Sequence, residues 1–290
     1  LCIDMEQYKY KDITIEAYKR LRSDPEFREF DQLALVLQAY LKDTDSDLDD
    51  LLGWARSEKL PVALRLVKGA YWDYETVLAK QNGWEIPVYT IKAESDAAFE
   101  RLSENILRNH DICYYACGSH NIRSISAVME MAAEIGVPEE RYEFQVLYGM
   151  AEPVRKGLLN VAKRVRLYCP YGELIPGMAY LVRRLLENTA NESFLRQSFA
   201  EEAQIEYLMQ DPLLTIEEEK NKITEIHEQE KNIRKAEQNV EEAKQILIDK
   251  VKDVKAIEKH KEKWLKKIKK EMAKEEQKNL DEIGNVLYSF

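Results

Sequence analysis

The sequence has few of the residues that build metal centres, disulfide scaffolds or membrane spans. It contains only four cysteines, and close CxxC pairs with histidine partners do not occur, so no metal site is predicted. No run of about 18 apolar residues exists that could cross a membrane. The formal charge of −10 argues against a nucleic-acid partner. All four cysteines lie in apolar, strand-like stretches, which predicts reduced core thiols and a cytoplasmic chain: Cys2, Cys113, Cys117 and Cys169.

The N-terminus also lacks an initiator methionine and the basic-then-apolar pattern of a signal peptide. Leu1–Asp4 instead resembles the middle of a β-strand. We therefore expect that earlier strands of the fold have been lost from this end.

Proline and glycine almost disappear after Pro212: all eight prolines and nine of the ten glycines lie at or before it. Residues 213–290 hold 18 acidic and 18 basic side chains, so the net charge belongs to residues 1–212, with 35 acids and 25 bases. Such a change of composition predicts a boundary between two domains, residues 1–212 and 213–290.

Apolar residues of the second region recur at heptad spacing. This pattern predicts an α-helical coiled coil or a helical hairpin, with charges on the remaining faces. Seven lysines between Lys259 and Lys270 are better explained as a solvated helix face than as a site for an anionic surface. Two seams carry the pattern: Ile226, Ile233, Val240, Leu247 and Val254, then Ala236, Ala243, Ile257 and Trp264.

In residues 1–212, short β-branched and apolar runs alternate with helical patterns. Their spacing of about 20 to 50 residues is typical of βα units in a parallel sheet. One intervening helix is expected over residues 122–134, with Ile125, Val128, Met129 and Ala132 on one face. The six expected strands are Leu1–Asp4, Leu33–Tyr40, Val62–Lys68, Ile112–Cys117, Tyr142–Leu147 and Arg164–Cys169.

Each of these runs ends in polar or glycine-bearing residues, as strands do in (βα)8 barrels, whose chemistry lies at the C-terminal strand ends. A doubly wound sheet would instead carry a glycine-rich turn after its first strand, and no GxGxxG is present. Six strands do not close a barrel. The predicted fold is therefore α/β, a (βα)8-type barrel that lacks its first strands and is followed by a coiled-coil tail.

Two clusters carry the chemistry. In Arg65–Asp73 (RLVKGAYWD), a strand delivers two cations to one end, and Gly69-Ala70 with two aromatics admits a planar, anionic ligand. On a helix, Tyr180, Arg183, Arg184 and Glu187 share one side, and paired arginines suit a carboxylate. An intrahelical Arg183–Glu187 ion pair is the alternative interpretation of the second cluster.

Together, Arg65–Asp73 and Tyr180–Arg196 (YLVRRLLENTANESFLR) resemble the proline dehydrogenase domain of the bacterial bifunctional proline-utilisation flavoenzymes. The resemblance covers about residues 1–211. The stretch 274–283 (KEEQKNLDEI) weakly resembles the small coiled-coil protein of the flagellar export apparatus. Intermediate segments agree with the enzyme family in order: Leu37–Tyr40, Ser119–Asn121, Phe144–Met150 and Tyr168–Gly172.

The resemblance implies roles for individual residues. Arg183 and Arg184 would hold the proline carboxylate, Asp4 would pair with one of these arginines, and Arg65 would hydrogen-bond near the flavin N5. The walls around the pyrrolidine ring would be Tyr168, Tyr180, Leu147 and Ala70. The isoalloxazine edges would contact Gln38 and Gln145. The remaining parts of FAD would be held by Lys68, Gly69, Trp72, Thr90, Lys92, Ser119, His120 and Asn121.

The implied reaction is FAD-dependent oxidation of L-proline to pyrroline-5-carboxylate, with hydride passing to flavin N5. In this family membrane quinone takes the electrons, which implies a peripheral position at the inner membrane face. The tail implies self-association.

The chain also departs from the family. A substrate-binding lysine on the family's first strand has no counterpart, the second strand is absent, and an exposed sheet edge would favour aggregation. The bifunctional enzymes continue into an aldehyde dehydrogenase domain, whereas this chain continues into a coiled coil. We therefore weigh a truncated or rearranged gene or a fragment against a genuine fusion. The alternative functions are a non-catalytic fragment and a coiled-coil interaction protein carrying a flavin-barrel relic.

Overall fold

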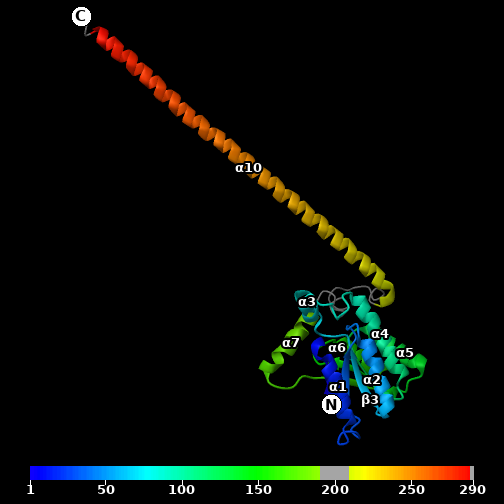
Figure 1. The fold of residues 1–290 in the computed structure, drawn as a ribbon. Helices are drawn as coiled ribbons and strands as arrows, with labels where there is room; N and C mark the ends of the chain where they lie inside the picture. Colours follow the sequence, from blue (N-terminus) through cyan, green and yellow to red (C-terminus); the bar gives the residue numbers. More distant parts are fainter. Residues whose placement is uncertain (190–208, 288–290) are drawn as a thin grey trace. The chain divides into compact units, whose positions relative to one another are not determined.

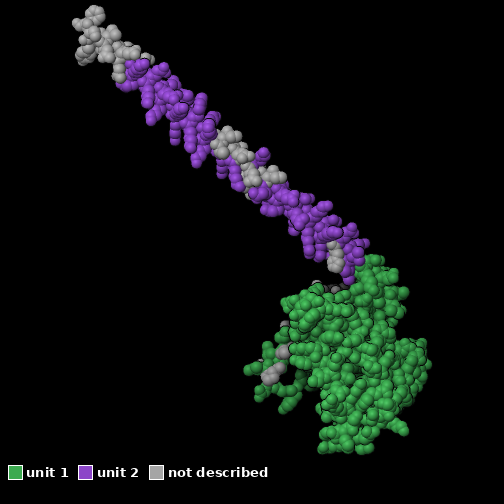
Figure 2. Space-filling model, viewed as in Figure 1, with its two compact units in different colours: residues 1–221 green, residues 222–290 purple. Residues whose placement is uncertain are grey.

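The chain divides into two compact units, which Figure 2 colours separately. A computed structural model describes residues 1–189 and 209–287, apart from some side chains of the C-terminal helices. We call residues 1–221 the head unit and residues 222–290 the tail unit.

The head unit contains one sheet of six parallel strands, paired in sequence order from first to last. Figure 1 shows the helices that lie around this sheet. Each strand lies within or overlaps one of the six runs expected from the sequence, so the prediction of consecutive βα units is confirmed. The sheet curls into a half-barrel. The strands are β1 (Cys2–Ile3), β2 (Ala34–Gln38), β3 (Val62–Val67), β4 (Cys113–Gly118), β5 (Tyr142–Leu147) and β6 (Val165–Tyr168).

Helices connect these strands, because a parallel strand can return to the starting edge only through a crossover. Short 3-10 turns, Tyr8–Tyr10 and Glu139–Arg141, precede α1 and β5. The helices of the head unit are α1 (Lys11–Ser23), α2 (Thr44–Glu58), α3 (Trp72–Asn82), α4 (Lys92–Arg108), α5 (Ile122–Ile135), α6 (Glu152–Val161) and α7 (Leu174–Thr189).

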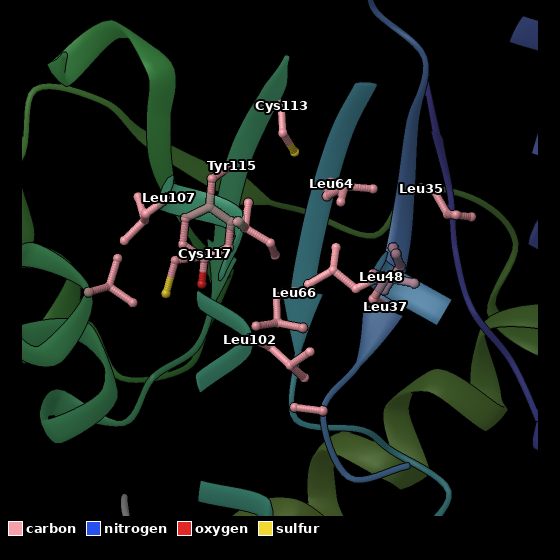
Figure 3. Packing of buried hydrophobic residues seen from close by; sticks show 14 of the residues in the cluster. Leu35, Leu37, Leu48, Leu64, Leu66, Leu102, Leu107, Cys113, Tyr115 and Cys117 are labelled. Atoms are coloured by element: carbon pink, nitrogen blue, oxygen red, sulfur yellow. The ribbon is translucent and has the colours of Figure 1, made fainter. Parts of the chain in front are cut away.

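Alternation along the strands separates a helix-facing core from a polar inner face. In β3, Leu64 and Leu66 are buried, whereas the alternate residues Arg65 and Val67 line a cavity. This is the period-two pattern of a pleated strand. Figure 3 shows the core between the sheet and its helices: Leu35, Leu37, Leu64, Leu66, Cys113, Tyr115 and Cys117 from strands, with Leu48, Leu102 and Leu107 from helices.

Helix α5 illustrates how local sequence fixes an element. The Asn121 side chain accepts a hydrogen bond from the backbone N–H of Ser124 at 3.3 Å, which caps the first turn. Ile125, Val128 and Ala132 are buried on one face, as expected from their spacing.

Three helices of the head unit end in the same way. The residue after each helix adopts the left-handed conformation, and its N–H returns to the carbonyls of the last turn. Gly83 ends α3 and Gly136 ends α5, but α2 ends at Lys59, with φ of 56°.

The cysteine prediction is partly wrong. All four thiols are free, Cys113 and Cys117 are buried in the core, and Cys2 is half-buried. Cys169, in contrast, is exposed because it follows β6, an outer strand of the sheet.

The tail unit is described as part of a single helix, α10 (Pro212–Leu287). The helix begins at the expected proline and is one element to Leu287, while the coiled-coil and hairpin alternatives stay predictions. Ile226, Ile233, Val240 and Trp264 are between 53% and 58% exposed, as an unpartnered seam would be. Over the described residues, no helix combines the length and apolar character needed to span a membrane.

Candidate active site

A cavity of about 580 Å³ lies at the C-terminal ends of the strands. Its size is that of a small-molecule or cofactor site. It gathers predicted residues from all six strand ends and from α7, although they are up to 180 positions apart in the sequence. The predicted residues that line it are Asp4, Gln38, Arg65, Lys68, Gly69, Ala70, Trp72, Lys92, Ser119, His120, Asn121, Gln145, Leu147, Tyr168, Tyr180, Arg183 and Arg184.

Two predicted residues are not placed there. The side chain of Thr90 is exposed and does not line the cavity. The side chain of Glu187 lies outside the described part of the chain, as does residue 190 onward of the motif that ends at Arg196.

Arg65 is the central cation of the inner face. It forms an ion pair with Asp4, and its Nη1 donates to Gln145 Oε1 at 3.3 Å. The guanidinium also lies 5.5 Å from the ring centroid of Tyr168. The resemblance implied Arg183 or Arg184 as the partner of Asp4, whereas its ion pair here is with Arg65 of β3, two strands away from β1.

Glu143 fixes the orientation of Gln145. No motif indicated this role, and the only signal was a charged residue in a buried strand. Gln145 Nε2 donates to Glu143 Oε1 at 2.6 Å, while its Oε1 accepts from Arg65. A carboxylate only accepts and a guanidinium only donates, so one amide orientation satisfies both. Burial alone would raise the pKa of Glu143, but donors led by Arg166 hold it below its usual value.

The part of the cavity around Gln38 retains unused hydrogen-bonding capacity. Gln38 Nε2 donates to the carbonyls of Met5 and Glu6, both at 3.2 Å, while its buried Oε1 has no partner among the described residues. Arg65 Nε is also buried and has no hydrogen-bond partner among the described residues. Buried polar atoms normally have partners, so a ligand with complementary polar edges fits here.

Two glycines border this part of the cavity. A Cβ added at Gly69, whose φ is 132°, would overlap the ring of Tyr40. A Cβ at Gly118 would lie 2.9 Å from Val67 Cγ1. Both positions therefore require glycine, because a side chain there would collide with neighbouring residues of the head unit.

Cationic groups gather at the adjoining end of the cavity. Lys68 follows β3, Lys92 begins α4, and both contact the carboxylate of Asp96. Ser119 and Asn121 lie near the N-terminus of α5, where free backbone N–H groups favour anions. Together these donors suit a phosphate-bearing ligand.

His120 connects two strand ends. Its Nε2 accepts a hydrogen bond from the backbone N–H of Leu147 at 2.9 Å. Burial, and secondarily the charge of Arg184, lowers the pKa of His120 to about 4, so the ring is neutral near pH 7. Only Nδ1 remains to contact the part of the cofactor predicted for this residue.

Aromatic rings flank the arginines of α7. The Arg183 guanidinium lies 5.2 Å from the Tyr71 ring centroid, and that of Arg184 lies 5.4 Å from Tyr180. The rings of Tyr180 and Tyr168 are 6.3 Å apart. Such rings hold a guanidinium in place and exclude water from its charge.

Tyr71 and Glu6 are site residues that the sequence interpretation did not assign. The Tyr71 hydroxyl donates to the Glu6 carboxylate. Burial, reinforced by Glu6, raises the pKa of Tyr71 to about 12. Tyr71 stands in the Arg65–Asp73 cluster, so its place could have been inferred; Glu6 has no local signal.

Over the described residues, no cluster of three or more His, Cys, Asp or Glu side chains could hold a metal ion. The cavity combines three kinds of group. Polar side chains around Gln38 and Arg65 have unused hydrogen-bonding atoms, two lysines form a cation cluster suited to a phosphate, and two arginines lie beside aromatic rings.

Comparison with protein families gives a match for each part of the chain. A family model described as proline dehydrogenase matches residues 1–197, and a model described as YscO-like protein matches residues 188–290. The second match is consistent with the tail's resemblance to an export-apparatus coiled-coil protein.

Curated relatives agree with the first match. The bifunctional protein PutA of Escherichia coli (strain K12) is 34% identical over 224 residues, which are 74% of this chain and 17% of PutA. Proline dehydrogenase 2 of Bacillus subtilis (strain 168) is 32% identical over 193 residues, 66% of this chain and 55% of the relative. The chain thus spans at most about half the length of these relatives.

Solved structures show the same fold. Proline utilization A of Bdellovibrio bacteriovorus, inactivated by N-propargylglycine, is 49% identical with a TM-score of 0.71, covering 73% of this chain and 22% of that one. The bifunctional proline utilization A of Bradyrhizobium japonicum, as its D779W mutant, is 32% identical with a TM-score of 0.70. With 197 residues matched by the family model, the chain belongs to the proline dehydrogenase family.

Proposed function

We propose that the head unit binds FAD and oxidises L-proline to pyrroline-5-carboxylate. The observation that carries this proposal is the meeting of two aromatic-flanked arginines from α7 with a flat, partly unsatisfied polar surface at the strand ends. A carboxylate ligand and a planar cofactor would fit side by side there.

A bound flavin would supply the acceptor for two electrons. Gln38 and Gln145 would hold the polar edges of its ring system, and Arg65 would face its reactive side. Lys68 and Lys92 would hold the phosphates. Because Asp4 and Gln145 both contact Arg65, this guanidinium is oriented before any ligand arrives.

Arg183 and Arg184 would hold the proline carboxylate and thereby fix which face of the ring is presented. Two guanidinium groups are suited to this task because each offers several donors in a rigid plane. Tyr168 and Tyr180 would border the ring and keep water away. This orientation is the protein's main contribution to rate.

With proline as the neutral amine, a hydride would pass to the bound flavin from the ring carbon that adjoins the nitrogen and lacks the carboxylate, and the proton on that nitrogen would pass to solvent. A carbon–nitrogen double bond forms, giving pyrroline-5-carboxylate. We propose that quinone then receives the two electrons, which would bring the head unit to the inner membrane face at each cycle.

An anaerobic absorption spectrum tests the proposal. Purified full-length chain should show the visible bands of oxidised flavin, and L-proline should bleach them. Flavin bands that persist with proline would favour a flavin-binding relic. A colourless, helical, self-associating product would overturn both flavin interpretations and favour the coiled-coil interaction protein.

For the tail unit we propose self-association through the seam of Ile226, Ile233 and Val240. These side chains are 53–58% exposed and recur every seven residues, so one copy of the helix leaves the seam uncovered.

Sedimentation of the full chain tests this interaction. Ile233→Lys with Val240→Lys should yield monomer, because two charges would enter the seam. Gln238→Lys with Gln245→Lys adds the same charge off the seam and should leave assembly unchanged. A wild-type monomer would contradict the proposal.

A further inference from the structure

Asp96 occupies a position between two cations of the cavity that neither the sequence motifs nor the proposed ligand contacts explain. It lies on the second turn of α4, and its side chain is 16% exposed. One carboxylate oxygen contacts Lys68 Nζ, and the other contacts Lys92 Nζ at 2.7 Å. The two ammonium groups arrive from different elements, the end of β3 and the start of α4.

Without Asp96 this arrangement would be unfavourable. Two like charges would stand close together with little water, since Lys68 is only 25% exposed and Lys92 39% exposed. The charge of Lys92 disfavours the ammonium form of Lys68. A carboxylate placed between them offsets both the repulsion and the lost hydration.

The groups that face Lys68 come from two elements. From α4 they are Asp96, Lys92 and Glu100, with the ring of Phe99 5.8 Å away. From β4 the buried thiol of Cys117 faces the same charge. Burial lowers the pKa of Lys68 below its usual value, and Asp96 is the leading group that opposes this shift. Lys68 and Lys92 in turn hold the pKa of Asp96 low against its own burial.

We propose that Asp96 is the positioning residue of the phosphate end of the cavity: it keeps Lys68 charged and aligned with Lys92 so that together they receive the diphosphate of a flavin dinucleotide. This inference rests on the proposed flavin-binding function. Asp96 itself, being an anion, would touch the lysines and not the phosphates.

The first test measures the charge of Lys68 without any ligand. The flavin-free full chain is labelled with an amine-reactive reagent at a series of pH values, and labelling at Lys68 is quantified by mass spectrometry. Asp96→Asn should move the labelling midpoint of Lys68 to lower pH. Lys92→Gln removes a repelling charge and should move it to higher pH. Glu104→Gln, farther along α4, is the control and should leave it unchanged.

Opposite shifts in the two variants are the decisive result, because a merely loosened structure would move both midpoints in one direction. An unchanged midpoint in Asp96→Asn, or shifts of the same sign, would overturn the proposal. Circular dichroism establishes that each variant is folded. Should Asp96→Asn fail to fold, a lower or unchanged midpoint in Lys92→Gln would overturn the proposal by itself.

The second test separates ligands with and without phosphate. A lysine contributes its charge below its pKa and loses it as pH rises, so FAD affinity of Asp96→Asn should fall by about tenfold between about pH 7 and about pH 9. The FAD affinity of the wild-type chain should change less over the same pH range. Riboflavin, which has no diphosphate, should show no difference between the two proteins.

The outcomes distinguish this inference from the proposed function. If wild type binds neither FAD nor riboflavin, the flavin-binding function fails, while opposite midpoint shifts would still support the electrostatic role of Asp96. If FAD binds and Asp96→Asn shows the pH dependence of wild type, the inference fails and the flavin-binding function stands.

Discussion

The two units of this chain are stabilised by different interactions. In the head unit, residues such as Leu66 and Phe144 are at most 1% exposed, and the cavity depends on side chains from all six strand ends. In the tail unit, Ile233 and Trp264 remain more than half exposed on one continuous helix. The head is held by tertiary burial, whereas the tail helix depends on local propensity and on whatever covers its seam.

This difference predicts how each unit responds to substitution. A substitution in the head should affect several helices and strands at once, because one side chain packs against more than one of them. A change in the tail should remain local unless its seam is covered by another copy. The following experiments test this contrast, from the largest expected effect to the smallest.

Removal of a substrate-binding charge should give the largest effect. Arg183→Met should raise the KM for proline by about 100-fold, the loss expected for a charge-assisted hydrogen bond to a carboxylate. Arg234→Met, in the tail, removes the same charge and should leave steady-state kinetics unchanged. Equal effects of the two variants would contradict the separation of the units.

Truncation of core side chains should come next. Leu66→Ala should lower the free energy of unfolding of the head by about 3 kcal/mol, because it leaves a cavity between β3 and its helices. Ile233→Ala should change the same transition by less than about 0.5 kcal/mol. Urea titration followed by near-ultraviolet circular dichroism measures both, and a large cost for Ile233→Ala in the head transition would mean that the stability of the head depends on the tail.

Acid should destabilise the head through His120. Its pKa is about 4 in the folded chain and about 6.5 when unfolded, so the unfolded state binds the proton first. Stability is therefore complete above about pH 6.5 and lost as pH falls toward 4, by up to about 3 kcal/mol. His120→Gln keeps an acceptor for the Leu147 N–H and should flatten this part of the stability profile measured by urea titration. A profile as steep as that of wild type would exclude His120 as its source.

A helix-weakening change in the tail should have the smallest effect on the site. Ala236→Gly should lower helix stability by about 1 kcal/mol, seen as reduced ellipticity on heating. Flavin absorbance and proline turnover should not change. A loss of flavin in this variant would mean that the head depends on the tail.

Much of the head fold could be predicted because its strands repeat one pattern. Strand order followed from the βα spacing, and the β3 and β5 boundaries were recovered almost residue for residue. The exposure of Cys169 could not be predicted, because an apolar strand at the edge of a sheet has the same sequence pattern as a strand in its centre. Nor does heptad spacing distinguish a continuous helix from a hairpin.

The lining of the cavity was predictable where its residues stand in contiguous motifs, as at Lys68 and Gly69. It was not predictable where a charge is paired across the sheet. Asp4 was assigned to the arginines of α7 but pairs with Arg65, and the supporting carboxylates Glu143 and Asp96 carry no local signal. Such pairings depend on which strands become neighbours, and that information lies outside any one motif.

The left-handed residue that ends α2 offers a way to strengthen the head without touching its chemistry. Gly83 and Gly136 occupy the corresponding position after two other helices, but Lys59 carries a side chain there, at a cost of about 1 kcal/mol. Lys59 is exposed and does not line the cavity. For protein engineering, Lys59→Gly is thus a natural first substitution, since it would raise the tolerance of this scaffold to costly changes made elsewhere in the cavity.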